Sequence, residues 1–330
     1  MPEAFKADSN RIIVIGGSSG AFTALRPLLS SLPADLPAAI FVVLHTGRDD
    51  NQLSADLLAA ASVLPVRLAK DGGAIEAGTV TLARADHHLL LGDAHVHTKR
   101  GPRENNFRPA VDPLFRSAAV FHGPRTIGLV LSGSLDDGAA GALALERVGG
   151  TVLAQAPDTA SFPSMPEAVL DLVSSARAVN LDDIPAVLSE LAASPAEPVR
   201  KAPPEDIVIE MKIAGLEGAS MAAEEKIGTL SPFNCPDCNG VLWEIEDKKL
   251  IRYRCHTGHA FTMRSLSESQ SGAMERSLYD ALRAHRGRIE LIRKLITKAD
   301  SDRSRQDYMA RVTSLEQDAE LIEQLLMRAG

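Results

Sequence analysis

Two adjacent serines lie in a glycine-rich turn near the start of the chain, within RIIVIGGSSGAFTAL, residues 11–25. Gly16, Ser18 and Gly20 satisfy the pattern G-x-S-x-G between a predicted strand and a predicted helix. Such a turn lifts a serine hydroxyl above the end of a sheet, where it can attack a carbonyl. A phosphate-binding loop is the competing interpretation, but Ser18 occupies the place of the second glycine of the dinucleotide pattern and no lysine follows. A tight turn without any chemistry also stays open.

A nucleophilic serine needs a base and an acid that orients the base. His45 directly follows the apolar run AIFVVL, and Asp136 and Asp137 follow the run TIGLVL after a short turn. The carboxyl ends of parallel strands form the edge at which open α/β sheets bind ligands, so we expect these side chains to meet Ser18 there. Either aspartate could instead be a helix N-cap. The order Ser, His, Asp along the chain differs from that of α/β-hydrolases, which disfavours that fold.

The elements that must position these residues follow from the hydrophobic pattern. Val/Ile/Leu runs alternate with Ala/Leu-rich amphipathic segments, which is typical of βα units around a mostly parallel, doubly wound α/β sheet. Residues 84–98 favour an antiparallel hairpin, which would make the sheet mixed. Asp112, before a proline, is the expected N-cap of its helix. The expected strands are 11–15, 39–44, 64–68, 79–83, 88–91, 94–98, 126–131 and 150–154, and the expected helices are 21–31, 51–62, 112–121, 138–148, 165–174 and 183–193.

A second chemical motif, CPDCNGVLWEIEDKKLIRYRCHTGHAF, contains all three cysteines of the chain. Cys235 and Cys238 form a Cys-x-x-Cys knuckle, and Cys255 with His259 supplies a second ligand pair. Four such ligands suit a closed tetrahedral zinc site of structural type. His259 is preferred to His256 because the residues between Cys255 and His259 let the chain turn back. Three reduced cysteines without a metal are the alternative, and a disulfide framework is not expected.

The composition of the sequence changes after Leu191, where the Pro-rich stretch AASPAEPVRKAPPED predicts a linker. Two later segments, from Met274 to Ile296 and from Met309 to Leu326, show helical periodicity around a turn at Asp300 and Ser301. Neither helix can bury its stripe alone, so the pair packs on itself and on the catalytic domain, a second copy or a partner. We predict a catalytic domain at 1–194, a linker with a helix at 195–230, a zinc-ribbon-like module at 231–263 and a helical hairpin at 264–330.

Composition and charge exclude several classes of function. The 330 residues are 45% hydrophobic and 24% charged, which is enough for a globular protein of about two domains. The net charge of -8 argues against general affinity for nucleic acid or anionic lipid. Lys248, Lys249, Arg252 and Arg254 nevertheless predict a local basic face on the zinc-ribbon-like module. The sequence has no signal-peptide pattern and no run of about 18 apolar residues, so we expect a cytoplasmic protein without membrane insertion.

Five blocks in this order resemble the catalytic domain of the chemotaxis protein-glutamate methylesterases, the CheB family: VIGGSSGAFTAL, FVVLH, RPAVDPLFRSAA, LVLSGSLDDGAAGALAL and PSMPEAVL. The resemblance covers about residues 10–193. It implies that Ser18 is the nucleophile, His45 the base and Asp137 the orienting acid. It also implies hydrolysis of γ-glutamyl methyl esters on methyl-accepting chemotaxis receptors, with release of methanol and without a catalytic cofactor, and deamidation of certain receptor glutamines.

Two features depart from the family pattern. Ser134 lies near the expected oxyanion site, where many members carry a methionine, and the backbone N–H of Ser19 is the expected oxyanion donor. The chain begins at the first catalytic strand, so we expect a stand-alone methylesterase without a receiver domain, with the C-terminal region in a docking or regulatory role. A non-catalytic docking protein with the same fold and a carboxylesterase for other esters are the alternatives.

Overall fold

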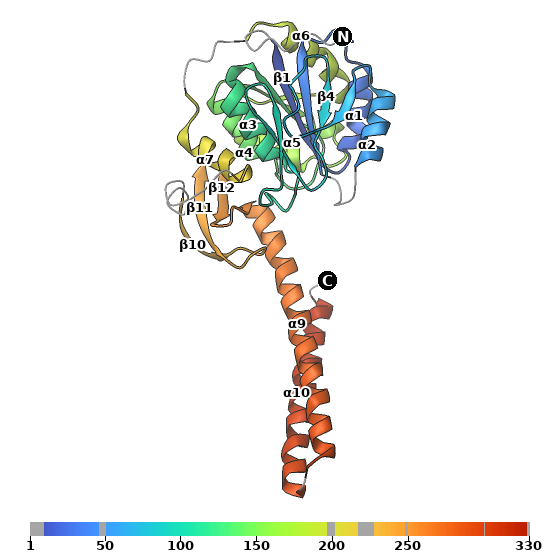
Figure 1. Ribbon diagram of the computed structural model, residues 1–330, viewed down its shortest axis with the longest axis vertical. Coiled ribbons are helices and arrows are strands. Elements are labelled where there is room, and N and C mark those ends of the chain that lie inside the picture. The colour runs from blue at the N-terminus through green and yellow to red at the C-terminus, as the bar shows by residue number, and fades with distance from the viewer. Residues whose placement is uncertain are drawn as a thin grey trace. The chain divides into compact units, whose positions relative to one another are not determined.

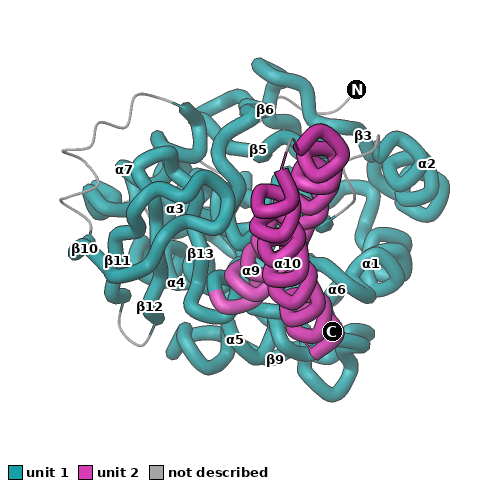
Figure 2. Tube along the Cα trace, turned by 90° about the horizontal axis from the view of Figure 1, so that it is seen from below, with its two compact units in different colours: residues 1–266 teal, residues 267–330 magenta. Residues whose placement is uncertain are grey.

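The computed structural model describes residues 10–45, 51–196, 202–216, 228–247, 250–299 and 301–328. Lys248, Lys249 and Asp300, named above, lie outside the described residues. The chain divides into two compact units, residues 1–266 and 267–330 (Figure 2). The expected catalytic domain and zinc-ribbon-like module therefore belong to one unit, and most of the C-terminal hairpin forms the other.

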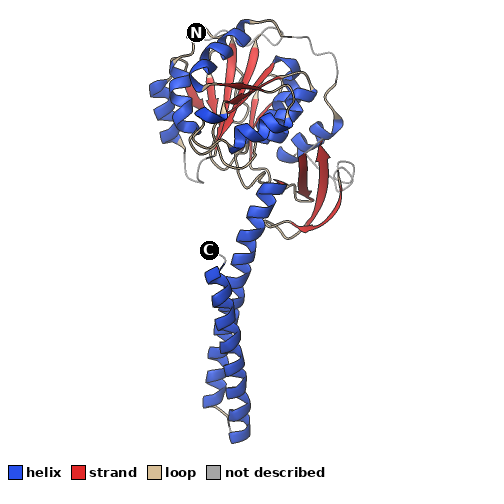
Figure 3. Ribbon diagram, turned by 180° about the vertical axis from the view of Figure 1, so that it is seen from behind, coloured by secondary structure: helices blue, strands red, loops and turns tan. Residues whose placement is uncertain are grey.

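A seven-stranded parallel sheet in the order β3-β4-β2-β1-β7-β8-β9 forms the centre of the first unit (Figure 3). β1 and β2 are buried along their whole length because helices cover both faces of the sheet, which explains their continuous apolar runs. The α/β fold expected from the sequence is confirmed. β9 was not expected, since two of its three residues are exposed and give no apolar run. The strands are β1 (Arg11–Gly17), β2 (Ala38–Leu44), β3 (Val66–Leu68), β4 (Val80–Leu82), β7 (Thr126–Val130), β8 (Thr151–Gln155) and β9 (Arg177–Val179).

Helices pack on both faces of this sheet (Figure 1). Ile12 and Val14 point to the face covered by α3, α4 and α5, whereas Ile13 and Ile15 point to the face covered by α1, α2 and α6. Successive residues of a strand alternate between faces, so a single strand supplies both cores. The helices are α1 (Ala21–Ser30), α2 (Gln52–Ala61), α3 (Val111–His122), α4 (Ala139–Arg147), α5 (Ser164–Leu172) and α6 (Ile184–Ala193).

The expected hairpin is present as β5 (His88–Leu91) and β6 (Val96–Lys99), which pair in antiparallel fashion. It forms a two-stranded sheet of its own instead of joining the parallel sheet. The expectation of a mixed sheet was therefore wrong. β5 is buried and packs against α3, so the hairpin covers that helix.

Two further elements complete the first unit. α7 (Glu205–Ala214) lies in the segment 195–230, for which a linker with a helix was expected. It packs against α3 and buries Ile207 in the core. A four-stranded antiparallel sheet, called here the β module, follows it in the order β10-β11-β12-β13. Its strands are β10 (Thr229–Asn234), β11 (Val241–Asp247), β12 (Leu250–Cys255) and β13 (Ala260–Thr262).

A buried network of charged side chains joins the β module to α3 and α7. Arg254 donates to Glu104 at 3.2 Å and to Glu210 at 2.8 Å, Arg252 donates to Glu210 at 2.7 Å, and Arg116 is paired with Glu104. The basic face predicted from Arg252 and Arg254 is therefore wrong, because both guanidinium groups are buried and paired with carboxylates. Breaking such a pair leaves an uncompensated buried charge, which costs about 3–5 kcal/mol.

The second unit consists of an antiparallel pair of long helices, α9 (Met263–Thr297), whose first residues belong to the first unit, and α10 (Asp302–Arg328). Ile289, Ile292 and Val312 form its buried core. Two cross-helix ion pairs, Arg286 with Glu323 and Arg293 with Glu316, both at 2.7 Å, fix the antiparallel register. Within the described residues, none of the helices is long and apolar enough to cross a membrane.

His122, the last residue of α3, makes the stability of the protein depend on pH. Its Nε2 lies 3.0 Å from Gly92 O and its Nδ1 lies 3.0 Å from Arg125 Nη2. Burial, together with the charge of Arg125, lowers the pKa of His122 to about 4. The neutral form is thus favoured on folding, and its stabilising effect is present above the unfolded pKa of about 6.5 and lost as the pH falls towards 4.

We expect the wild type to lose about 3 kcal/mol more stability than His122→Gln over this pH range, because glutamine does not titrate. Urea unfolding at a series of pH values measures the difference. Parallel curves for the two proteins would contradict the assignment.

Candidate active site and cysteine cluster

The three predicted catalytic residues follow the three central strands of the sheet. β1 lies between β2 and β7, and the chain order reverses across it, which makes this edge a topological switch point. Ser18 follows β1, His45 follows β2, and Asp137 lies seven residues beyond β7. The His45 N–H donates to Gly17 O at 3.1 Å, so Ser18 and His45 occupy equivalent positions at the ends of adjacent strands.

Ser18 lies in a sharp turn between β1 and α1. Its N–H donates to Ser132 O at 3.0 Å and its carbonyl accepts the Ala21 N–H at 3.0 Å. Gly20 has a φ of 80°, which favours glycine. Gly133 packs against the serine, since a Cβ added there would lie 2.9 Å from Ser18 Cβ. A side chain at position 133 would clash with the Sδ of Met165 and would crowd Ser18 as well.

The two other residues predicted at the oxyanion site lie close by. Ser19 is exposed, its carbonyl accepts the Ser132 hydroxyl at 2.8 Å, and no described residue accepts its N–H. Ser134 is exposed and directly follows Gly133. Ser19 directly follows Ser18 in the turn, and its exposed backbone N–H is without an acceptor among the described residues.

His45 and Asp137 form a buried pair. The distance from His45 Nε2 to Asp137 Oδ2 is 2.7 Å, and both side chains are about 2% exposed. The ring of Phe107 stacks on the imidazole, with the centroids 3.6 Å apart and the planes 8° from parallel. His45 Nδ1 is buried without a hydrogen-bond partner among the described residues. With Nε2 directed at Asp137, Nδ1 is the nitrogen left to accept a proton.

Asp137 is held in its charged form. Burial alone would raise the pKa of Asp137, but its hydrogen bonds, that from His45 above all, outweigh burial and lower the pKa. The other donors are the N–H groups of Val111 at 2.7 Å and Asp112 at 3.2 Å, and Asn105 Nδ2 at 3.0 Å. The two backbone donors belong to the first turn of α3, where the helix dipole also favours a negative charge.

The neighbouring Asp136, which the sequence left open as an alternative acid, faces away from His45. Its carboxylate accepts the Thr262 hydroxyl at 2.7 Å, so it contacts the β module and not the imidazole. The structure thus brings Asp137, and not Asp136, into contact with His45.

Asp112 differs from its expected role as the N-cap of its own helix, because α3 begins one residue earlier, at Val111. Its carboxylate instead accepts the N–H groups of Gly138 at 3.0 Å and Gly141 at 2.7 Å, at the start of α4. Burial, together with the nearby charge of Asp137, raises the pKa of Asp112 to about 7. The two helices therefore exchange carboxylates. Asp137, which precedes α4, accepts the first N–H groups of α3, and Asp112, in the first turn of α3, accepts N–H groups at the start of α4.

Three residues of the site were not identified from the sequence as site residues: Asn105, Phe107 and Asp112. The one available signal for the first is the Asn-Asn dipeptide at 105 and 106, since both residues have left-handed backbone angles, with φ of 50° and 73°. Asparagine tolerates that region better than other residues with a Cβ, so the dipeptide indicates a specially shaped loop. Stacking by Phe107 has no comparable sequence signal.

The four predicted metal ligands lie together in the β module. The sulfur atoms of Cys235, Cys238 and Cys255 and a nitrogen of His259 are all within 4.8 Å of one another. Cys238 Sγ lies 3.6 Å from Cys255 Sγ, and His259 Nδ1 lies 3.5 Å from Cys255 Sγ and 3.7 Å from Cys235 Sγ. Bond lengths of about 2.3 Å to sulfur and 2.0 Å to nitrogen in a tetrahedral site give edges of about 3.5–3.8 Å. The residues thus fit one tetrahedral zinc ion.

Comparison with known proteins identifies the family. Residues 13–188, more than half of the chain, match the family model described as CheB methylesterase. The chain belongs to the CheB methylesterase family. The CheB methylesterase catalytic domain of Thermotoga maritima has a similar structure, with a TM-score of 0.54 and 34% sequence identity over 56% of this chain and 99% of that chain. This CheB segment contains Ser18, His45 and Asp137.

Curated relatives match this chain over stretches of similar length. A "Protein-glutamate methylesterase/protein-glutamine glutaminase 2" of Anaeromyxobacter dehalogenans is 39% identical over 180 residues, 54% of this chain and 53% of the relative. A "Protein-glutamate methylesterase/protein-glutamine glutaminase 1" of Bordetella avium is 38% identical over 189 residues, 57% of this chain and 55% of the relative. The chain thus spans about half the length of the curated relatives that it matches. The matches leave the β module and the C-terminal helices outside the shared CheB region.

Proposed function

We propose that this chain is a cytoplasmic protein-glutamate methylesterase that acts on methyl-accepting chemotaxis receptors. The observation that carries the proposal is the placement of Ser18, His45 and Asp137 at the switch point of a CheB-family domain. The names of these relatives describe methylesterase and glutaminase activities, which supports the choice of glutamyl esters as substrates and of glutamine deamidation as a second activity.

In the proposed mechanism, Ser18 Oγ attacks the ester carbonyl while His45 Nδ1 takes the hydroxyl proton. Asp137 holds the imidazole through Nε2 and stabilises its charged form. The Ser19 N–H stabilises the tetrahedral oxyanion, and His45 returns the proton to the departing methanol. Water then attacks the acyl-enzyme with the same histidine as base and frees the glutamate. With a glutamine substrate, ammonia leaves in place of methanol, and no cofactor takes part in either reaction.

Methanol release from purified methylated receptors tests this proposal. Wild-type protein is expected to release methanol at a rate that increases with receptor concentration and to leave glutamate at the modified positions. A general carboxylesterase would hydrolyse small aryl esters equally well in the absence of receptor. A non-catalytic docking protein would bind receptor without releasing methanol, and that result would refute the proposal.

We further infer that the cysteine cluster holds one structural Zn²⁺. The ligands would be Cys235, Cys238, Cys255 and His259, whose separations suit tetrahedral coordination. Four protein ligands leave no open position for a catalytic water, so the metal would be structural. Because two ligands lie in the β10–β11 turn and two lie at or after the end of β12, the metal would join the β10–β11 turn to the β12–β13 turn. The carboxylate of Asp237 lies 3.8 Å from His259 Nε2, on the ring nitrogen that would face away from the metal.

The oligomeric state is a separate part of the proposal. α9 and α10 bury one shared row of apolar side chains, as expected for packing within the chain. A further set stays exposed on the same two helices: Met274, Leu291, Leu295, Leu321 and Leu325. Association of these helices with a second copy would cover such a set, and sedimentation equilibrium measures whether it occurs.

A further inference from the structure

The β module contacts a short loop beside the active site, residues 103–107, called here the support loop. The backbone of β13 pairs with it: the Asn105 N–H donates to Ala260 O at 2.8 Å, and the Ala260 N–H donates to Arg103 O at 3.1 Å. Ala260 directly follows His259, a proposed zinc ligand. The same loop carries Phe107, which stacks on the imidazole of His45. The support loop therefore connects the cysteine cluster with the buried pair of His45 and Asp137.

The side chain of Asn105 is bonded from both directions. Its Nδ2 donates to Asp137 Oδ1 at 3.0 Å and to Asp112 Oδ2 at 2.9 Å. Its Oδ1 accepts the Thr262 N–H at 3.1 Å and the Ser265 hydroxyl at 3.2 Å. Asn105 is 3% exposed, so water does not replace these partners. Because the acceptors and donors fix both ends of the amide, residues of the β module and of the start of α9 set the direction in which Asn105 donates to Asp137.

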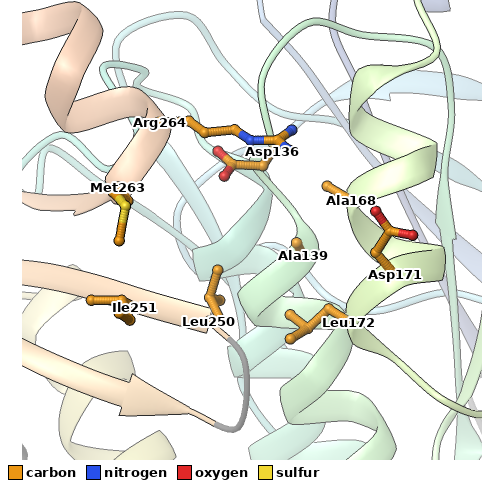
Figure 4. A pocket seen from close by; sticks show the side chains of 9 residues that line it. All are labelled: Asp136, Ala139, Ala168, Asp171, Leu172, Leu250, Ile251, Met263 and Arg264. Carbon is orange, nitrogen blue, oxygen red and sulfur yellow. The ribbon is translucent and has the colours of Figure 1, made fainter.

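A second contact reaches the residue beside the catalytic acid. Thr262 Oγ1 donates to Asp136 Oδ1 at 2.7 Å and accepts the Ser265 N–H at 3.1 Å, which caps the start of α9. The contact borders a pocket of about 280 Å³ lined on one side by Asp136 and α4 and α5, and on the other by Leu250, Met263 and Arg264 (Figure 4). The Arg264 side chain extends towards Asp136 in this pocket (Figure 4).

The backbone of the support loop needs such external contacts. Asn105 and Asn106 are both left-handed, with φ of 50° and 73°. Consecutive residues in that region are strained for L-amino acids and persist where the surrounding structure holds them. The surroundings here are β13 on one side and the two carboxylates, Asp112 and Asp137, on the other.

We propose that the β module is a positioning device for the active site, in which the Thr262 backbone N–H and the Ser265 hydroxyl lock Asn105. Asn105 in turn keeps Asp137 directed at His45, and the Thr262 hydroxyl holds the neighbouring Asp136. The inference rests on the proposed esterase function and assigns a role to a part of the chain that lies outside the shared CheB region. Thr262, Ser265 and Asn105 are positioning residues, because they act through Asp137 and His45.

The double variant Thr262→Val/Ser265→Ala keeps the backbone, including the Thr262 N–H that donates to Asn105, and the approximate shape of both side chains. It removes the Ser265 hydroxyl bond to Asn105 and the Thr262 hydroxyl bonds to Asp136 and to the Ser265 N–H. We expect it to lower kcat for methanol release about 10- to 100-fold with little change in KM, because loss of orientation affects the transition state more than receptor binding. Thr262→Ser keeps the hydroxyl and is expected to retain kcat within about twofold. Thr229→Val, at an exposed position of β10, is the matched control and is expected to behave as wild type.

A second measurement does not depend on activity. The proton on His45 Nε2, shared with Asp137, gives a far-downfield NMR signal that is expected in the wild type and in Thr229→Val, and weakened or shifted in the double variant. An unchanged kcat together with an unchanged signal would overturn the inference while the esterase function stands. A wild type that releases no methanol would refute the function, and the NMR comparison would then decide the inference. If the double variant does not fold, each single variant carries the same two measurements.

Discussion

Replacing Ser18 with alanine is expected to lower kcat for methanol release by about 10⁵- to 10⁶-fold, the loss found when the nucleophile of a serine hydrolase is removed. In the proposed mechanism this residue supplies the attacking oxygen. The substitution removes one oxygen, and the hydrogen bonds of Ser18 to the described residues are made by its backbone. The free energy of unfolding is therefore expected to change by less than about 0.5 kcal/mol.

Ser19→Ala is the matched control, because the two serines are adjacent and only Ser18 is assigned the attack. It keeps the backbone N–H that is proposed to stabilise the oxyanion, so kcat is expected to stay within about threefold of wild type. Methanol release, receptor binding and thermal unfolding are measured on all three proteins. Equal activity of Ser18→Ala and wild type would refute the mechanism, and inactivity of Ser19→Ala alone would reassign the nucleophile.

Replacing His259 with alanine is expected to remove zinc from the protein and to destabilise the β module by several kcal/mol. Isolated zinc-finger peptides gain about 10–16 kcal/mol from the metal, and here the buried Arg and Glu network supplies part of the stability independently. Metal analysis of purified protein is expected to give one zinc per chain for the wild type. Thermal unfolding is expected to begin at lower temperature in the variant, and treatment of the wild type with a chelator is expected to have the same effect.

His256→Ala is the control for this prediction. The two histidines are three residues apart, but only His259 lies in the cluster, and His256 is exposed. His256→Ala is therefore expected to keep its zinc and its unfolding temperature. Loss of zinc from His256→Ala with retention in His259→Ala would reverse the ligand assignment, and an absence of zinc from the wild type would leave three reduced thiols in its place.

The parallel sheet and the ends of its strands could be predicted from the sequence because each strand carries its own signal. Continuous apolar runs marked β1, β2 and β7, and polar residues directly after them marked the edge where Ser18 and His45 lie. The grouping of the three cysteines with His259 was also predictable, since the Cys-x-x-Cys spacing reflects local turn geometry. Where the signal was short or exposed, as in β9, the prediction failed.

What could not be predicted are the contacts between segments far apart in the sequence. A basic surface was predicted from Arg252 and Arg254 because their partners, Glu104 and Glu210, lie between 42 and 150 residues away along the chain, and the sequence alone does not show that they meet. Asp112 read as a local cap for the same reason, since Gly138 reaches its carboxylate only through the packing of α3 on α4. Local sequence fixes which groups are polar, and tertiary packing decides what they face.

The exchange of carboxylates between α3 and α4 has a consequence for the evolution of this family member. Asp137 serves folding as well as its proposed catalytic role, because its oxygens accept the first N–H groups of α3, while Asp112 does the same for α4. Under the proposed function, a descendant that no longer hydrolysed esters would still be selected to keep both aspartates. The Ser18 side chain caps none of the described helices in this way, so selection for folding would not prevent its substitution. In a set of related sequences, the residue at position 18, and not the aspartate, therefore separates working esterases from relatives that keep only the fold.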